Sequence, residues 1–362
     1  MGSIFGERVR ISIFGESHGR SVGVVIDGLP SGIPIDTDAI SAHMLRRAPG
    51  QALWTSARRE GDVAEIQSGV YRGYTTGTPL CAMIQNFNTR STDYEELRSK
   101  PRPSHADYTG KIRYGGFEDP RGGGHFSGRL TAPIVFAGAV CLQVLQRHDI
   151  FVGAHALEIG GVRDTGFESV RLDREFLHHL VRREFPVISD ESGEGMKACI
   201  EEARRALDSV GGIVECGIVN VPPGFGDPIF GGIESRIGAM VLSIPAVKGV
   251  EFGDGFRIAG RRGSENNDPL VFDNGAIHTA TNHNGGVDGG ISNGMPIVFR
   301  VVVKPTASIA QAQRTVDLEK GTEETLVIKG RHDPCIVPRA VPVVEAAAAI
   351  ALLDVMVLQG KY

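Results

Sequence analysis

The sequence predicts a single domain of the α+β class spanning residues 1–362. Of the 362 residues, 41% are hydrophobic and 22% are charged, a composition typical of a folded protein with a large core. Strand-like and helix-like patterns alternate without the regular strand–helix–strand period of a parallel sheet. No Pro- or Ser-rich linker and no internal repeat divides the chain. Candidate functional segments are spread along nearly its whole length, so we expect them to build one compact unit.

Alternating apolar and polar residues predict the strands. The first is Val-Arg-Ile-Ser-Ile at residues 9–13, just before a glycine-containing turn. Further strands are expected at residues 22–26, 212–219, 296–303 and 324–328.

Two segments predict buried helices. Residues 131–147 are apolar almost all round, and residues 343–357 are rich in Ala and Leu. The charge-free stretch at 130–146 is slightly short for a membrane span and contains Thr131, Pro133 and Gln143. A core helix is therefore favoured over a membrane helix.

Two further helices are expected from amphipathic spacing, at residues 194–208 and 172–185. The first of them would place four apolar side chains on one face: Met196, Ile200, Ala203 and Leu207.

Charge and cysteine usage limit the partners and the compartment. A net charge of −5 gives no reason to expect nucleic acid or an anionic membrane as partner. The five cysteines form no CxxC pair and no Cys/His cluster, so we expect free thiols, a reducing cytoplasm and no metal site. The first residues lack the apolar segment of a secretory signal, which also favours the cytoplasm.

Glycine is abundant, at 48 residues, and it is clustered between apolar segments rather than spread through polar linkers. The sequence Arg-Gly-Gly-Gly-His-Phe-Ser at residues 121–127 leads into the helix predicted from 131. A glycine-rich loop before a helix is suited to binding an anion. Neither the Walker pattern nor GxGxxG is present, so a Rossmann-type dinucleotide site is not indicated.

Arginine greatly outnumbers lysine in residues 1–130, with fourteen Arg and two Lys. The pairs Arg46-Arg47 and Arg58-Arg59 lie on either side of a Pro-Gly turn. Arginine stays charged and offers a planar fork of donors to phosphate and carboxylate, which suits a small polyanionic substrate. Solvated surface charge is the alternative explanation.

Two histidines are expected on loops. His18 lies in Gly-Glu-Ser-His-Gly at residues 15–19, and His105 follows Pro103, which disfavours helix before it. Imidazoles there could exchange protons at neutral pH. Alternatively, His18 belongs to a plain turn and Asp107 simply holds His105 by a hydrogen bond.

Two segments near the C-terminus carry polar groups after predicted strands. Lys-Pro-Thr-Ala-Ser at 304–308 suits a phosphate or a ring carbonyl, or is a plain polar loop. Arg-His-Asp-Pro-Cys at 331–335 is either catalytic or a local salt bridge at a turn.

Taken together, these segments resemble the chorismate synthase family over essentially the whole chain and in the same order. The resemblance rests on motifs at residues 15–19, 46–50, 58–60, 69–79, 102–108, 121–124, 208–212, 247–251, 304–306 and 331–335. It implies a sandwich of two antiparallel sheets enclosing a helical layer, assembled as a homotetramer. It also implies a 1,4-anti elimination of phosphate from 5-enolpyruvylshikimate 3-phosphate, giving chorismate, in the shikimate pathway of aromatic amino acid biosynthesis. Reduced FMN is required without net redox change.

The resemblance also implies residue roles. His18 would protonate the leaving phosphate, His105 would stabilise reduced flavin at its N1/O2 edge, and Asp333 would relay the C6 proton near flavin N5. Substrate contacts would come from Ser17, Arg46, Arg47, Arg129 and Arg339. Flavin contacts would come from His125, Phe126, Ser127, Pro245, Ala246, Gly289, Lys304, Pro305, Thr306, Ala307, Ser308 and Arg331.

Four positions depart from the family pattern. His125 and Phe126 stand where many members have Arg and Ser, which leaves only backbone contacts unaffected. Pro245 replaces an Asn and its amide contact. Leu53 replaces an Arg, which favours an external flavin reductase over NADPH as the source of electrons. A flavin-dependent oxidoreductase acting on a small anionic substrate is the alternative function, and a non-catalytic anion-binding protein is a second alternative.

Overall fold

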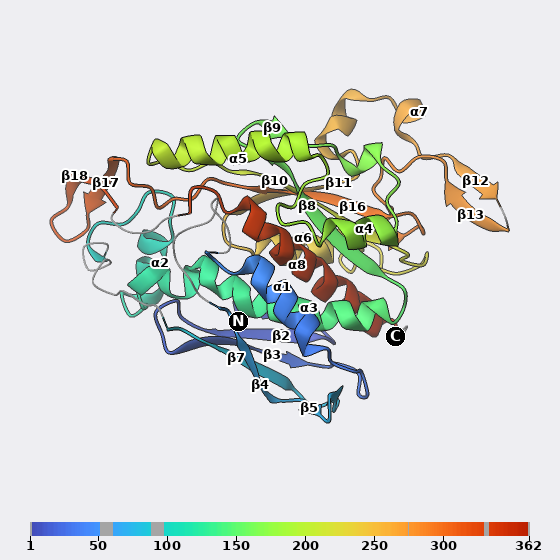
Figure 1. Cartoon of the computed structure of the whole chain (residues 1–362), viewed down its shortest axis with the longest axis horizontal. Coiled ribbons are helices and arrows are strands. Elements are labelled where there is room, and N and C mark those ends of the chain that lie inside the picture. Colours follow the sequence, from blue (N-terminus) through green and yellow to red (C-terminus); the bar gives the residue numbers. More distant parts are fainter. Residues whose placement is uncertain (1, 51–60, 88–97, 274, 329–332, 361–362) are drawn as a thin grey trace.

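The computed structural model describes residues 2–50, 61–87, 98–273, 275–328 and 333–360. Figure 1 shows a layer of helices lying between two sheets. Each of these sheets has five strands, and all their strand pairs are antiparallel. The predicted α+β sandwich is thus confirmed.

The first sheet contains the N-terminal strands. Its order is β1 (Ile4–Phe5), β2 (Arg10–Gly15), β3 (Ser21–Asp27), β7 (Leu80–Gln85) and β4 (Ala64–Ser68). The second sheet has the order β11 (Val247–Phe252), β16 (Ile297–Val303), β10 (Gly212–Val219), β8 (Phe151–Ile159) and β9 (Val162–Arg163). Its strands β8, β10 and β16 are almost entirely buried, because helices cover them and few polar side chains interrupt their apolar residues.

The helical layer consists of α1 (Thr37–Arg47), α3 (Thr131–Gln146), α6 (Ile233–Leu242) and α8 (Val337–Leu358). The segment Gly128–Gln146, which ends in α3, and α8 are long and apolar enough to cross a membrane, but the most apolar part of each is 89% buried within the protein. They pack so closely that a Cβ atom at Gly138 would lie 2.2 Å from Cβ of Ala346. Both are core helices, as predicted, although α8 begins six residues before the expected start.

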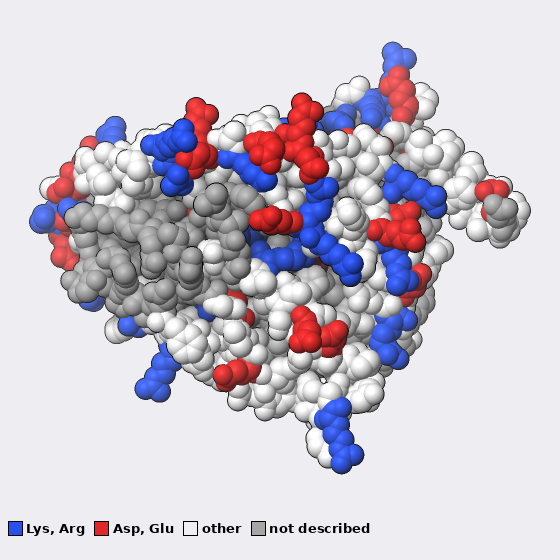
Figure 2. All heavy atoms as spheres, in the orientation of Figure 1, with Lys and Arg blue, Asp and Glu red and all other residues white. Residues whose placement is uncertain are grey.

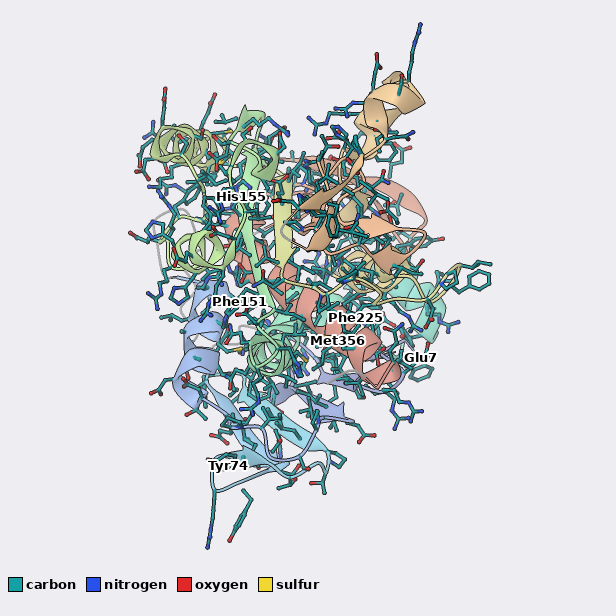
Figure 3. The ribbon with its side chains drawn as sticks, turned by 90° about the vertical axis from the view of Figure 1, so that its right-hand side faces the viewer. Glu7, Tyr74, Phe151, His155, Phe225 and Met356 are labelled. Atoms are coloured by element: carbon teal, nitrogen blue, oxygen red, sulfur yellow. The ribbon has the colours of Figure 1, made fainter. Side chains whose placement is uncertain are left out.

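Outside the second sheet lie α4 (Arg174–Leu180) and α5 (Asp190–Arg205), which contact β8 on the face opposite α8 (Figure 1). Figure 3 shows the layers from the side, with Tyr74 beyond the first sheet and His155 in the second. On the face drawn in Figure 2, positive and negative side chains are interspersed. Along α5, Glu201 pairs with Arg204 and Arg205.

The prediction was wrong at the end of α5. Leu207 is not on the apolar face, because the helix ends at Arg205 and Leu207 is 57% exposed with φ 58°. The Asp208 N–H donates to the Ala203 carbonyl at 2.9 Å, which closes a Schellman motif and reverses the chain. The helix also starts earlier, since Ser189 caps its first turn.

Smaller elements complete the chain. They are α2 (Asp107–Tyr114), α7 (Gly263–Asn266), the 3-10 helices η3 (Arg121–Phe126), η4 (Gly128–Leu130), η5 (Phe167–Ser169) and η6 (Gly255–Gly260), and the two-stranded pairs β5 (Val70–Tyr71) with β6 (Tyr74–Thr75), β12 (Leu270–Asp273) with β13 (Ala276–Thr279), β14 (Val287–Asp288) with β15 (Ile291–Ser292), and β17 (Gln313–Asp317) with β18 (Thr322–Leu326). The strand expected at 324–328 is therefore β18, shifted by two residues. The helix expected at 172–185 is the shorter α4.

Candidate functional site around a glycine loop

The turn between β2 and β3 buries His18 against a glycine loop. His18 is 7% exposed and Ser17 is 1% exposed. The loop is the start of η3, where Gly122, Gly123 and Gly124 have φ values of 62°, 84° and 52°. A Cβ atom at Gly122 would lie 2.6 Å from Cδ2 and Nε2 of His18, so only glycine permits this contact.

The next glycine of the same loop faces His105. A Cβ atom at Gly123 would lie 3.1 Å from Cε1 and 3.2 Å from Nε2 of His105. The structure therefore brings together the two histidines that the sequence analysis placed on separate loops. Gly122 and Gly123 form a bare strip of backbone between the two imidazoles.

A carboxylate orients His105. Its Nδ1 lies 2.6 Å from Oδ1 of Asp107, and Asp107 also accepts hydrogen bonds from Nε and Nη2 of Arg102, both at 2.7 Å. Burial raises the pKa of Asp107, but the hydrogen bonds from Arg102 and His105 outweigh it and hold the pKa far below the usual range. The Asp107 carboxylate stays charged, which leaves Nε2 of His105 as the nitrogen turned toward the glycine loop.

The loop after β16 approaches the same region. Lys304 donates from Nζ to the Ser104 carbonyl at 2.5 Å, and Ser308 accepts from Nη1 of Arg102 at 3.1 Å. Burial, and secondarily the charge of Lys248, lowers the pKa of Lys304. The backbone N–H of Lys304 donates to the Ala246 carbonyl, and Ala246 has a φ of 74°, unusual for a residue with a side chain.

Within this loop, the side-chain hydroxyl of Thr306 is buried without a hydrogen bond from the described part of the chain. Its Oγ1 is buried and has no hydrogen-bond partner among the described residues. Its carbonyl accepts from the Ser209 hydroxyl at 2.8 Å, which fixes the backbone. Burial of an unsatisfied hydroxyl is costly, so a ligand group at this position would relieve the cost.

Two predicted substrate arginines share one carboxylate that the sequence analysis did not single out. Arg47 donates from Nη1 to Oδ2 of Asp62 at 2.5 Å, and Arg129 donates from Nη1 to Oδ1. All three side chains are at most 5% exposed. Burial raises the pKa of Asp62, but the charges and hydrogen bonds of Arg47 and Arg129 outweigh it, so the pKa lies below its usual value. The two arginines and the carboxylate together have a net charge of +1.

The other two predicted arginines differ in their partners. Arg339 donates from Nε to the Arg47 carbonyl at 2.9 Å and from Nη1 to Asp333. Arg46 donates from both Nη1 and Nη2 to Glu345 of α8, at 2.6 and 2.8 Å. Arg339 thus joins Asp333 to the Asp62 cluster, whereas Arg46 ties α1 to α8.

The side chains of His125 and Phe126 contact other parts of the chain. The His125 ring lies 2.8 Å from the Gly15 carbonyl through Nδ1 and 2.8 Å from the Ser3 hydroxyl through Nε2. The Phe126 ring packs on α2, where a Cβ atom at Gly110 would approach it to 2.6 Å. Their side chains hold the glycine loop in place. Ser127 caps η4 by accepting from the Arg129 N–H at 3.2 Å.

Gly289 lies beyond the N-terminal end of α6. It turns the hairpin between β14 and β15, and the neighbouring Gly290 carbonyl accepts from Ile233 at the start of α6. Pro245 and Ala246 follow the other end of that ten-residue helix, a span of about 15 Å. Arg331 and Leu53 lie outside the described residues.

Sequence reasoning named Arg102 only as part of a motif and did not name Asp62. The one signal for Asp62 was its place two residues after the Arg-Arg-Glu motif at 58–60. Within the described ranges, no group of three or more His, Cys, Asp or Glu side chains could hold a metal ion.

Comparisons with known proteins agree on one family. The family model described as chorismate synthase matches residues 9–357. A chorismate synthase of Korarchaeum cryptofilum is 48% identical over 353 residues, covering 98% of this chain and 97% of the relative. One from Dehalococcoides mccartyi is 44% identical over 360 residues, covering 99% and 98%. A chorismate synthase crystal structure superimposes with a TM-score of 0.75 at 29% identity, covering 98% of this chain and 93% of that one. The chain therefore belongs to the chorismate synthase family.

Proposed function

We propose that the chorismate synthase reaction of this chain takes place at the glycine loop, with His18 and His105 in separate proton-handling roles. The chain is a lyase of the shikimate pathway, which removes phosphate from 5-enolpyruvylshikimate 3-phosphate to give chorismate. The observation that carries the location is the contact of both imidazoles with adjacent glycines of one loop.

His18 protonates the departing phosphate. A phosphate leaves more easily when a proton or a cation neutralises its developing charge. The imidazole is buried beside Ser17, and the bare backbone of Gly122 lets another group come close to it. Ser17 hydrogen-bonds the same phosphate.

The arginines bind the three anionic groups of the substrate, one phosphate and two carboxylates. Arg47 and Arg129 form the centre of this subsite, and Arg339 extends it toward Asp333. Arg46 contributes mainly by fixing α1 against α8 through its paired contact with Glu345.

Reduced FMN, when bound, would supply an electron-rich flavin to the reaction. The family uses reduced FMN, and the unmet Thr306 hydroxyl and the adjoining 304–308 loop fit a ligand with several acceptors. The residues that would hold it are His125 and Phe126 through their backbone, Ser127, Pro245, Ala246, Gly289, Lys304, Pro305, Thr306, Ala307, Ser308 and Arg331. His105, oriented by Asp107, would offer its Nε2 hydrogen bond to the bound flavin, and Asp333 would serve as the acid that relays the proton lost from C6.

The proposal is tested by replacing His18 with Ala. We expect kcat to fall by about 10²–10⁴, because a positioned general acid contributes that much. Phosphate release is measured anaerobically with reduced FMN present. His148, an exposed residue just after α3, provides the control, and His148→Ala should leave kcat unchanged. Equal rates for the wild type and His18→Ala would reject the role of His18.

Three further parts of the proposal concern the setting of the enzyme. The enzyme acts in the cytoplasm and receives its electrons from an external flavin reductase, so NADPH and FMN alone should not support anaerobic turnover.

It assembles as a homotetramer, which is supported by the exposed apolar side chains of the β12–β13 hairpin, Leu270, Phe272 and Ile277. Light scattering that gave the mass of a monomer would contradict the assembly.

A further inference from the structure

We propose that Asp62 is a positioning residue that holds Arg47 and Arg129 side by side for the anionic substrate. This inference rests on the proposed function of the arginines. Each oxygen of the carboxylate accepts from a different guanidinium. Asp62 is 3% exposed, so its carboxylate is shielded from bulk water.

The geometry leaves donors available to a ligand. Arg47 uses Nη1 for Asp62, Nε for Thr131 Oγ1 at 3.1 Å and Nη2 for the Gly128 carbonyl at 3.1 Å. A guanidinium has five N–H donors, so these three contacts with the described residues orient the group without exhausting it. The guanidinium is therefore preorganised before the substrate arrives.

The charge of Asp62 is what allows two buried cations to be neighbours. Two guanidiniums in a poorly solvated site repel each other, and a carboxylate between them offsets that repulsion. Asp62 has a φ of 44°, a left-handed conformation that Asp tolerates better than most residues. The backbone thus adopts an uncommon conformation where the carboxylate meets both arginines, as is often found at functional sites.

The pair is also linked to the glycine-loop site. Arg129 donates from Nε to Oδ1 of Asn86 at 3.0 Å, and Nδ2 of Asn86 donates to the carbonyls of Glu16 and Gly19 at 3.1 and 3.0 Å. These carbonyls flank His18. A shift of Arg129 would therefore change the distance between the cationic subsite and the proposed proton donor.

The test is Asp62→Asn, which keeps the size of the side chain and removes its charge. We expect kcat to fall at least tenfold, because the two guanidiniums lose their common anchor. The inhibition constant for inorganic phosphate should not increase, because the subsite has gained a net positive charge. A purely structural role predicts instead that kcat and phosphate binding are lost together.

The control and the contrary outcomes are defined in the same series. The control is Asp27→Asn, which removes the exposed ion pair between Asp27 and Arg10. It should change neither kcat nor the inhibition constant for phosphate. An unchanged kcat in Asp62→Asn, or a parallel loss of kcat and phosphate binding, would overturn the inference.

If Asp62→Asn did not fold, Asp62→Glu would replace it, since Glu keeps the charge balance but displaces the carboxylate. Again a tenfold lower kcat with undiminished phosphate binding supports the inference, and a wild-type kcat overturns it. An inactive wild type would instead reject the proposed function.

Discussion

At the scale of single residues, the site depends on where the protein leaves out side chains. Gly122 and Gly123 place bare backbone against two imidazoles, and their φ values are ones that other residues rarely adopt. The histidines are thus held by packing and, for His105, by Asp107. The glycine loop therefore lets the two imidazoles lie close to the backbone while their positions stay fixed.

Gly122→Ala tests this arrangement. The new Cβ would stand 2.6 Å from the His18 ring and must displace it. We expect kcat to fall at least tenfold, since small displacements of a catalytic group are costly. Gly116 has a φ of 80° and no atom within 4 Å of an added Cβ, so Gly116→Ala carries the same backbone strain without the clash. Similar kcat values for the two variants in the phosphate-release assay would show that the loop contact is unimportant.

Sequence reasoning reached the histidines but not their partners. His18 and His105 were identified because glycine or proline beside a histidine indicates a loop, and loop position is a local property. Asp62 could not be identified, because its importance lies in contacts with Arg47 and Arg129, which are 15 and 67 residues away. Likewise, nothing local indicates that Arg46 pairs with Glu345, 299 residues away.

At the scale of elements, the close packing of α3 on α8 sets the thickness of the helical layer. Gly138 is the contact point, where an added Cβ would lie 2.2 Å from Cβ and 2.3 Å from Cα of Ala346. Both helices lead from the site region, since α3 follows the glycine loop and α8 carries Arg339 near its start.

We therefore expect Gly138→Ala to lower the free energy of unfolding by about 1–3 kcal/mol, because overpacking separates the helices. This is notable because Ala normally favours a helix over Gly by about 1 kcal/mol. Urea denaturation measures the change. Gly260→Ala, where an added Cβ meets no atom within 4 Å, should be close to neutral. Equal stability of Gly138→Ala and wild type would contradict the packing described.

The second sheet contains a buried ionic cluster remote from the glycine loop. His155, labelled on β8 in Figure 3, lies 3.2 Å from Asp164 and 3.1 Å from Glu215. Glu215 also accepts from Arg300, which pairs with Glu251 and Glu168. Burial lowers the pKa of His155, but the hydrogen bonds and charges of Asp164 and Glu215 outweigh it, so the pKa lies above its usual value.

A raised pKa of His155 has a definite consequence for stability. The stabilisation by the imidazolium is complete below the unfolded-state pKa near 6.5 and is lost as the pH rises through the folded-state pKa. We expect the free energy of unfolding to decrease from pH 6.5 upward, and His155→Gln to remove that dependence. Removing one partner should also cost about 3–5 kcal/mol at pH 6. Urea titrations at several pH values would refute this if both proteins showed the same slope.

Helices and strands were predictable wherever a continuous apolar pattern marked them, as for residues 131–147 and 212–219. The end of α5 was not predictable. Leu207 has the spacing of a residue on the apolar face, and only the chain reversal at Asp208 turns it outward. Pairing of strands was also out of reach of local patterns. β16 lies between β10 and β11, which depends on contacts rather than on order in the sequence.

At the scale of the whole molecule, the sandwich gathers the site from distant parts of the chain. The turn after β2, the loop before α3, the loop after β16 and the start of α8 all contribute residues. The α+β class followed from the sequence pattern, whereas the sandwich of two sheets followed from family resemblance and is confirmed by the structure.

The central claim is that this site eliminates phosphate with reduced FMN present but not consumed. The most direct measurement follows phosphate, chorismate and reductant together under anaerobic conditions, for wild type and for Asp333→Ala. We predict many phosphates released per reducing equivalent in the wild type, one chorismate for each phosphate, and a strongly reduced rate in Asp333→Ala. Consumption of one reducing equivalent for each phosphate would contradict the claim and indicate an oxidoreductase.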